Sequence, residues 1–143
     1  MKTRNLLLIL GLMISLGSRA QEISQKQIDF ANAFIEAVSS HNQKKVIKMM
    51  DKEYRKEQLA NLKGNKKQFV DELFGGEDMK DPSIYANIKL ENVIKIEIAE
   101  VIPLKSGNKY NYIFRVRDSQ FDILTTLILK KRGKKFGFIG SFG

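Results

Sequence analysis

Two tyrosines and two carboxylates are the side chains of this sequence that are placed for acid–base chemistry. Tyr110 and Tyr112 alternate with other polar residues along an expected strand, so both phenols are expected on one face. A proton-transfer site needs such a group inside a pocket, where burial shifts its pKa. The base would have to be Glu100 or Asp122, one of which would need to enter the pocket. No Asp, Glu or His falls at a mid-strand position of the apolar faces, which argues against this chemistry.

The sequence offers no spacing typical of a metal, nucleophile or phosphate site. His41 is the single histidine and the chain has no cysteine, so no metal site is expected. Ser141 lies between Gly140 and Phe142, outside the strand–turn–helix context of a serine nucleophile. The pair at residues 75–76 is Gly-Gly, but two acids follow it where a phosphate-binding loop has Lys and Ser. We therefore expect no cofactor.

A second group of residues is placed to line a pocket rather than to catalyse. They share inward-facing positions in the expected strands or the first helix, and they are Phe34, Asn92, Tyr110, Tyr112, Thr125 and Phe138. An inner face rich in Phe and Ile with few polar groups is typical of an apolar binding pocket. The same pattern fits a fully packed core, in which the tyrosines and Asn92 have structural roles.

The most basic segment is the turn at residues 130–135. It contains Lys130, Lys131, Arg132, Lys134 and Lys135 with no acid among them, whereas the other basic clusters are interleaved with acids. Interleaved charges are typical of a solvated surface. The turn is therefore the predicted contact for anionic lipid headgroups or polysaccharide.

The first twenty residues have the pattern of a cleavable signal peptide. A basic start is followed by an apolar run from Leu6 to Leu16, and residues 18–20 (Ser-Arg-Ala) fit a cleavage site before Gln21. The apolar run is too short to span a bilayer. Removing Met1–Ala20 lowers the formal net charge from +9 to +6. We expect a periplasmic or secreted domain without a lipid anchor and without a nucleic-acid partner.

The first half of residues 21–143 has helical spacing. Ser24 is an expected N-cap with Gln27 as its capping-box partner, and Asn42 and Asn65 are expected to cap two further helices. Residues 24–75 are predicted to be helical, ending at Gly75.

The second half alternates apolar and polar residues, as half-buried antiparallel strands do. One strand is predicted over residues 88–102, with its even positions inward, and three more follow along residues 109–143. Short turns make these strands sequential neighbours. The predicted fold is a single α+β domain over residues 21–143, with N-terminal helices on the concave face of a curved four-stranded antiparallel meander sheet.

This order of elements resembles the nuclear transport factor 2-like, or cystatin-like, α+β cone. The resemblance rests on the helix–turn–helix at residues 30–54 (FANAFIEAVSSHNQKKVIKMMDKEY), a third helix and the meander, and His41-Asn42 stands where the family typically has Gly-Asp. That family includes isomerases, dehydratases and binding proteins, so the fold alone does not indicate the activity.

The functional prediction has two alternatives. The first is an exported, non-enzymatic domain that binds a small apolar ligand or a protein partner, and the resemblance adds a homodimer through the sheet. The second is a small isomerase- or dehydratase-like enzyme, with Tyr110 or Tyr112 as the acid.

Overall fold

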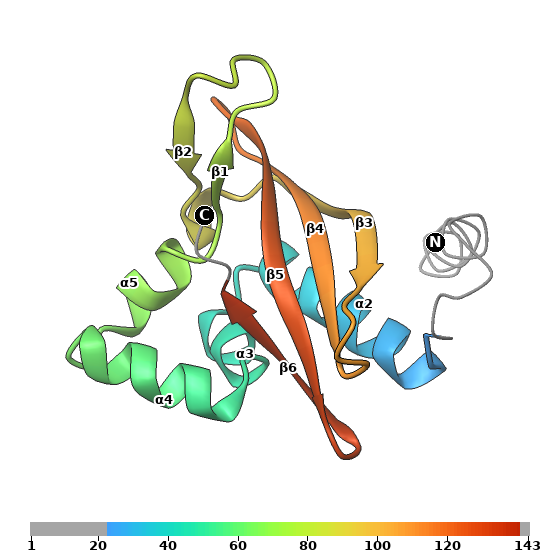
Figure 1. The fold of residues 1–143 in the computed structure, drawn as a ribbon. Helices are drawn as coiled ribbons and strands as arrows, with labels where there is room; N and C mark the ends of the chain where they lie inside the picture. The colour runs from blue at the N-terminus through green and yellow to red at the C-terminus, as the bar shows by residue number, and fades with distance from the viewer. Residues whose placement is uncertain (1–22, 141–143) are drawn as a thin grey trace.

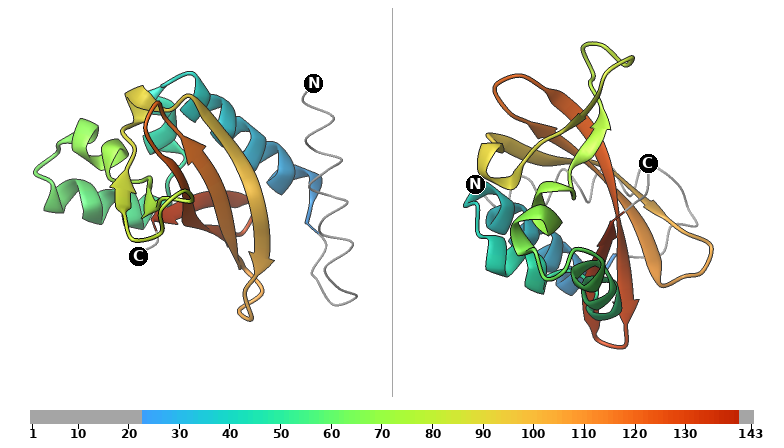
Figure 2. Two further views of the ribbon diagram at one scale, coloured as in Figure 1. Left: turned by 90° about the horizontal axis from the view of Figure 1, so that it is seen from above. Right: turned by 90° about the vertical axis from the view of Figure 1, so that its left-hand side faces the viewer.

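The structure is a computed structural model that describes residues 23–140. The predicted leader and the last three residues lie outside the described residues. Helices come first along the chain and a four-stranded antiparallel sheet follows, so the predicted α+β class is confirmed (Figure 1). Helix α2 runs across one face of the curved sheet, and the shorter helices gather beside its last strand (Figure 2).

The helical half contains one long helix and three short ones. They are α2 (Gln25–Ser39), α3 (Gln43–Lys48), α4 (Lys52–Asn61) and α5 (Lys66–Asp71). The side chains of Ser24, Asn42 and Asn65 each accept a hydrogen bond from a backbone N–H of the first turn, which confirms all three predicted N-caps. Asp51 caps α4, a helix that the highly charged sequence had not separated from its neighbour.

The predicted capping box at the start of α2 is wrong. Gln27 is 2% exposed, and its side chain turns away from the helix end. Its Nε2 donates a hydrogen bond to the hydroxyl of Tyr112, 2.9 Å away in the interior. Tertiary packing therefore overrides the local capping signal.

The main sheet is the predicted meander. Strands β3 (Lys95–Pro103), β4 (Lys109–Arg117), β5 (Asp122–Arg132) and β6 (Lys135–Gly140) pair antiparallel in sequential order. Burial alternates strictly along β4, with the even-numbered residues inside. The inner face covers one cluster of buried side chains that also takes in α2, α3 and α5.

A two-stranded hairpin not predicted from the sequence joins α5 to the sheet. Strands β1 (Gly75–Glu77) and β2 (Tyr85–Asn87) pair with each other, and β1 continues onto the edge of β5 through a bridge between Asp78 and Ile123. A Cβ on Gly76 would collide with the carbonyl oxygen of Leu124, so the glycine permits this close approach.

The single strand predicted over residues 88–102 is interrupted twice. Residues Leu90–Asn92 form a 3₁₀ turn, η1, which shifts the alternation so that Val93 is buried and Ile94 is exposed. A β-bulge between Ile98 and Glu100 then shifts it again, since a bulge adds one residue to one strand only. The prediction that every even position points inward is therefore wrong at Asn92, Ile94 and Ile102, all of which are exposed.

Candidate functional site

The predicted pocket-lining aromatic residues lie together at the centre of the core. Phe34, Tyr112 and Phe138 are at most 1% exposed. The ring centroids of Phe34 and Phe138 are 4.6 Å apart, and those of Tyr112 and Phe138 are 5.6 Å apart. Rings at these separations are in contact and leave no room between them for another molecule. Thr125 is also buried, opposite Phe114, whereas Asn92 lies outside this group.

The two candidate phenols are buried on the inner face as the alternation predicts. Burial raises the pKa of Tyr112 to about 12, more than the hydrogen bond from Gln27 lowers it. Burial also raises the pKa of Tyr110. Both phenols are therefore neutral throughout the physiological range and can act as hydrogen-bonding groups rather than as bases.

Neither candidate carboxylate lies with the phenols. The β4–β5 register puts Asp122 opposite Arg117 on the outer face, where Arg115 donates hydrogen bonds of 2.9 and 2.6 Å to it. This hydrogen-bonding lowers the pKa of Asp122. The bulge likewise puts Glu100 opposite Ile113, on the outer face. The acid–base alternative needs one of these carboxylates inside, so the geometry gives it no support.

His41 has a structural contact. Its backbone is left-handed, with φ of 55°, and its Nε2 lies 2.8 Å from the carbonyl oxygen of Val93. The side chain thus joins the α2–α3 turn to the end of the 3₁₀ turn η1. Within residues 23–140 no three His, Cys, Asp or Glu residues are grouped as metal ligands would be.

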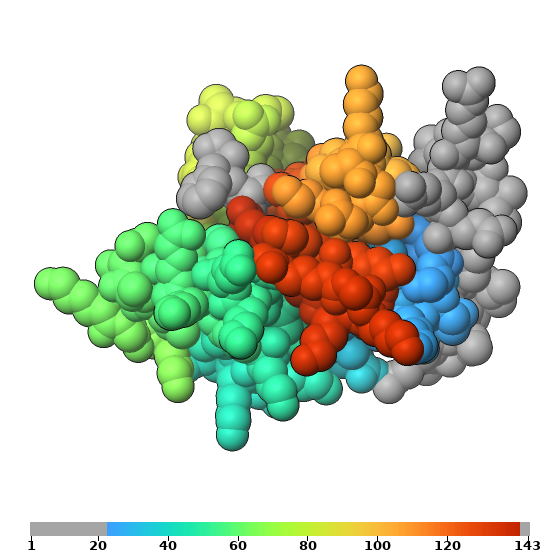
Figure 3. All heavy atoms as spheres, turned by 60° about the horizontal axis from the view of Figure 1, so that its bottom comes forward, coloured from blue at the N-terminus to red at the C-terminus, as the bar shows by residue number. Residues whose placement is uncertain are grey.

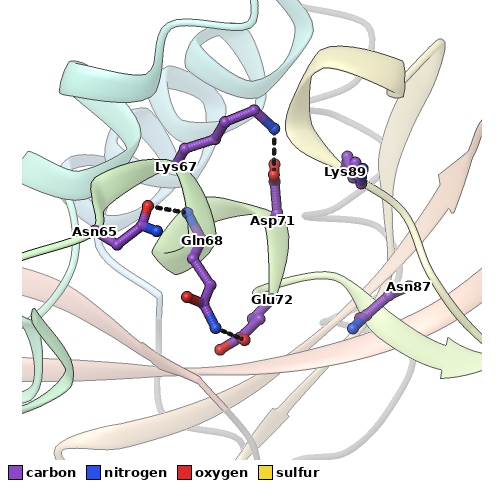
Figure 4. Close-up of a pocket in the computed structure, with 7 residues that line it drawn as sticks. All are labelled: Asn65, Lys67, Gln68, Asp71, Glu72, Asn87 and Lys89. Atoms are coloured by element: carbon purple, nitrogen blue, oxygen red, sulfur yellow. Dashed lines mark hydrogen bonds and ion pairs between the residues drawn. The ribbon is translucent and has the colours of Figure 1, made fainter. Parts of the chain in front are cut away.

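An open pocket of about 370 Å³ lies between α5 and the segment around β2 (Figure 4). The residues that line it are all polar or charged, and several are paired with one another: Lys67 bonds to Asp71 at 2.6 Å and Gln68 to Glu72 at 2.8 Å. None of the predicted site residues lines it. Ligand pockets enclose most of their ligand, whereas this one is open to solvent.

The strongest feature outside the core is a segregation of charge. The β5–β6 hairpin, the β3–β4 turn and the α3–α4 region lie at the lower end of Figure 1. Residues 43–57, 104–109 and 130–135 in these segments contain thirteen Lys or Arg and three Asp or Glu. The rest of residues 23–140 contains nine basic and twelve acidic residues. We call the three segments together the basic end.

The predicted basic turn is extended by a neighbouring turn. Lys109 pairs directly with Lys130 in the β4–β5 ladder, and the N–H of Lys131 donates to the carbonyl oxygen of Asn108 at 2.8 Å. Like charges placed directly opposite each other in a sheet are destabilising. The fold thus concentrates positive charge here at a cost in stability.

Backbone pairing brings the α3–α4 region to the same end. The N–H of Asp51 donates to the carbonyl oxygen of Phe138 at 2.8 Å, and the N–H of Phe138 donates to that of Met49 at 3.0 Å. Gly137 makes this possible, because a Cβ there would lie 2.6 Å from the Cα of Asp51. The hairpin and the α3–α4 region consequently lie side by side on one surface (Figure 3).

Arg132 differs in role from the lysines around it. Its guanidinium donates to both carboxylate oxygens of Asp51, at 2.8 and 3.2 Å, and to Glu53 at 3.0 Å. Burial opposes the charged form of Asp51, but the hydrogen bonds from Arg132 and from the N–H of Tyr54 outweigh it, so the pKa of Asp51 is lowered. Arg132 therefore anchors the hairpin to α4, and its contact with an anionic surface stays a prediction.

Replacing Asp51 by Asn should remove this anchor while keeping an N-cap for α4. The variant should lose about 1–3 kcal/mol of unfolding free energy at pH 7, the range for hydrogen bonds to charged groups. A carboxyl whose pKa is lowered on folding stabilises above its unfolded pKa, near 4, and that contribution is lost as the pH falls through the folded value. Urea titrations from pH 7 to pH 3 should therefore show the difference between wild type and variant shrinking.

The matched control is Glu57→Gln, on the exposed surface of the same helix. This variant should follow the wild type at every pH. A constant difference between Asp51→Asn and the wild type across the titration would contradict the ion-pair account.

The cationic residues of the basic end that the sequence alone does not assign to the site are Lys44, Lys45, Lys48, Lys52, Arg55, Lys56, Lys105 and Lys109. The six in residues 43–57 are interleaved with acids, a pattern that predicts a solvated surface. Two of those acids, Asp51 and Glu53, are in fact paired with Arg132. Their pairing with a residue some 80 positions away has no local signal.

Comparison with known proteins adds no further assignment. The chain matches no family model and no curated protein sequence. The resemblance to the α+β cone family accordingly stays a prediction. In the described part of the chain, no helix has the length and apolarity needed to cross a membrane.

Proposed function

We propose that this protein is a non-enzymatic binding domain that docks through its basic end onto a polyanionic partner. The observation that carries the proposal is the charge segregation, with thirteen basic and three acidic residues in three adjoining segments. A surface field of one sign attracts and orients an oppositely charged partner. Predicted export would place that partner outside the cytoplasm.

The other predicted functions have less support. A small apolar ligand would have to displace the contacts among Phe34, Tyr112 and Phe138 in the core. An enzyme would need a base beside the phenols, where the register places neither Glu100 nor Asp122. The homodimer through the sheet stays a prediction.

The arrangement of the lysines supports a role for them outside the protein itself. Lys109 and Lys130 face each other across two strands, and Lys131, Lys134 and Lys135 are exposed on the same hairpin. Their mutual repulsion costs stability in the free protein. A bound polyanion would relieve this repulsion. The loss of repulsion between the lysines would therefore contribute to the free energy of binding.

Binding to polyphosphate tests the proposal. We expect the protein to bind it at low salt and the affinity to fall steeply as salt is added, because screening weakens exposed charges. Changing Lys130, Lys131, Lys134 and Lys135 together to Gln should weaken binding about a hundredfold or more, since each such charge contributes on the order of 1 kcal/mol near an anionic surface. Titration calorimetry measures both effects.

The matched control removes four exposed lysines elsewhere, Lys63, Lys66, Lys80 and Lys89, again to Gln. It has the same net charge as the hairpin variant and should bind within about threefold of wild type, because its lysines lie outside the basic end. Equal losses in the two variants would show that only net charge matters, and the proposal would then fail.

A further inference from the structure

We infer that the polyanion is the surface of an anionic phospholipid bilayer, which the domain meets with its hairpin tip and the start of α4. The inference rests on the proposed function and adds the partner's chemistry to it. Two features of the basic end favour a bilayer over a soluble polyanion such as a sulfated glycan or polyphosphate: the type of its cations and the aromatic pair at its base.

The first feature is that lysines, and not the arginine, carry the unpaired charge of the hairpin. Of its five cations, the one arginine is ion-paired with Asp51 and Glu53, and the four lysines make no ion pair within residues 23–140. Arginine is preferred where a carboxylate or phosphate is held in a fixed geometry, because its guanidinium donates two parallel hydrogen bonds to such a group. Lysine is a flexible point charge that attracts a diffuse anionic layer without a defined contact geometry. A fluid headgroup region is such a layer.

The second feature is apolar surface next to these lysines. Phe136 lies directly opposite Lys131 in the hairpin and is only partly buried. Its ring contacts that of Phe30 on α2, which is also partly buried, with the ring centroids 5.7 Å apart and the planes tilted by 38°. Partly exposed aromatic rings beside cations gain free energy at a bilayer interface, because the rings enter the boundary region while the charges meet headgroups. A soluble polyanion has no apolar region that the rings could enter.

The net negative charge outside the basic end sets the orientation of the domain relative to the bilayer. Outside the basic end, residues 23–140 carry nine basic and twelve acidic residues, so this part is repelled by an anionic surface. Only one approach brings the positive end forward. The β1–β2 hairpin, at the opposite end of the molecule in Figure 1, then points away from the membrane.

Vesicles test the inference. The protein should sediment with vesicles that contain phosphatidylglycerol and not with vesicles of phosphatidylcholine alone. Binding should be lost on raising the salt from about 0.1 M to about 1 M, where the Debye length falls from about 10 Å to about 3 Å. The hairpin variant (Lys130, Lys131, Lys134 and Lys135 to Gln) should bind at least tenfold more weakly, and the Lys63, Lys66, Lys80 and Lys89 variant should bind as wild type.

A site-specific probe tests the orientation. The sequence contains no cysteine, so Lys134→Cys can be labelled at one position with a dye that reports polarity. Its emission should shift to the blue on anionic vesicles, and that of a label at Lys80→Cys should not. Melting curves of all variants establish that each is folded before its binding is interpreted.

The outcomes separate the two proposals. Binding to polyphosphate without binding to anionic vesicles would overturn the inference and leave the proposed function standing, with a soluble polyanion as the partner. Binding to neither would overturn both. Vesicle binding that is unchanged in the hairpin variant, or a blue shift at position 80 rather than at 134, would also overturn the inference.

Discussion

Phe138→Ala is expected to lower the free energy of unfolding by about 3–5 kcal/mol, the range for truncating a fully buried aromatic ring. Phe138 is 0% exposed, and its ring contacts those of Phe34, Tyr112 and Phe114. Alanine would leave a cavity that the neighbouring residues of α2 and β4 cannot fill without moving backbone. Urea unfolding followed by circular dichroism measures the loss.

Ile139→Ala is the matched control, because it is next in β6 and points to the outer face, opposite Ile128. It should cost no more than about 1.5 kcal/mol, since less apolar surface is removed from a half-buried site. The comparison of the two variants also tests how tightly the aromatic rings of the core are packed. A loss below about 1 kcal/mol for Phe138→Ala would mean that the rings are loosely packed, and the apolar-ligand hypothesis would regain support.

Gly137→Ala is expected to cost about 2–4 kcal/mol, although it adds only one methyl group. The new Cβ would lie 2.6 Å from the Cα and 2.8 Å from the N of Asp51, and backbone atoms cannot rotate away as a flexible side chain does. The strand would have to withdraw, which would break the hydrogen bonds of Phe138 with Met49 and Asp51, each worth about 1 kcal/mol. Binding to polyphosphate should weaken as well, because the α3–α4 region would no longer adjoin the hairpin.

Gly133→Asn is the control for the loss of a glycine in the same hairpin. Gly133 has φ of +59°, which asparagine tolerates, and a Cβ there would meet nothing within 4 Å. We expect a loss below about 1 kcal/mol. If both variants lost the same amount, backbone conformation rather than close contact would explain the effect of Gly137→Ala.

The parts of the fold that follow local rules were predictable from the sequence. Ser24, Asn42 and Asn65 have side chains that satisfy a helix N-terminus, and each does so in the structure. The alternation along β4 and β5 predicted their inner faces, including Tyr110, Tyr112 and Thr125. These signals depend on neighbours in sequence, so no tertiary information was needed.

The errors lie where tertiary contacts outweigh a local pattern. The 3₁₀ turn at Leu90–Asn92 exposes Asn92 and allows both Leu90 and Val93 to reach the core, which a continuous strand would not permit. The bulge after Ile98 also has no signal in the sequence, because the run of alternating Ile and charged residues predicts a regular strand. Gln27 has the right spacing for a cap but meets the buried hydroxyl of Tyr112 instead.

The candidate site was predictable only in part. The hairpin lysines stand out as a basic segment without an acid, and the structure presents them at one end of the fold. Lys109 and Lys52 join them through the β4–β5 ladder and through the pairing of Asp51 with Phe138. The residues that make these contacts are far apart in the sequence, so no window of the chain contains the site.

The bulge in β3 also affects whether two copies of the protein can pair through their sheet edges. β3 ends the order β3-β4-β5-β6, and an edge strand with unpaired backbone groups can recruit a strand from another molecule. Its bulge, its charged Lys95 and Glu97 and the final Pro103, which lacks an N–H, all disfavour such pairing. The exposed edge of the main sheet at β3 is therefore protected against pairing with a strand of a second copy.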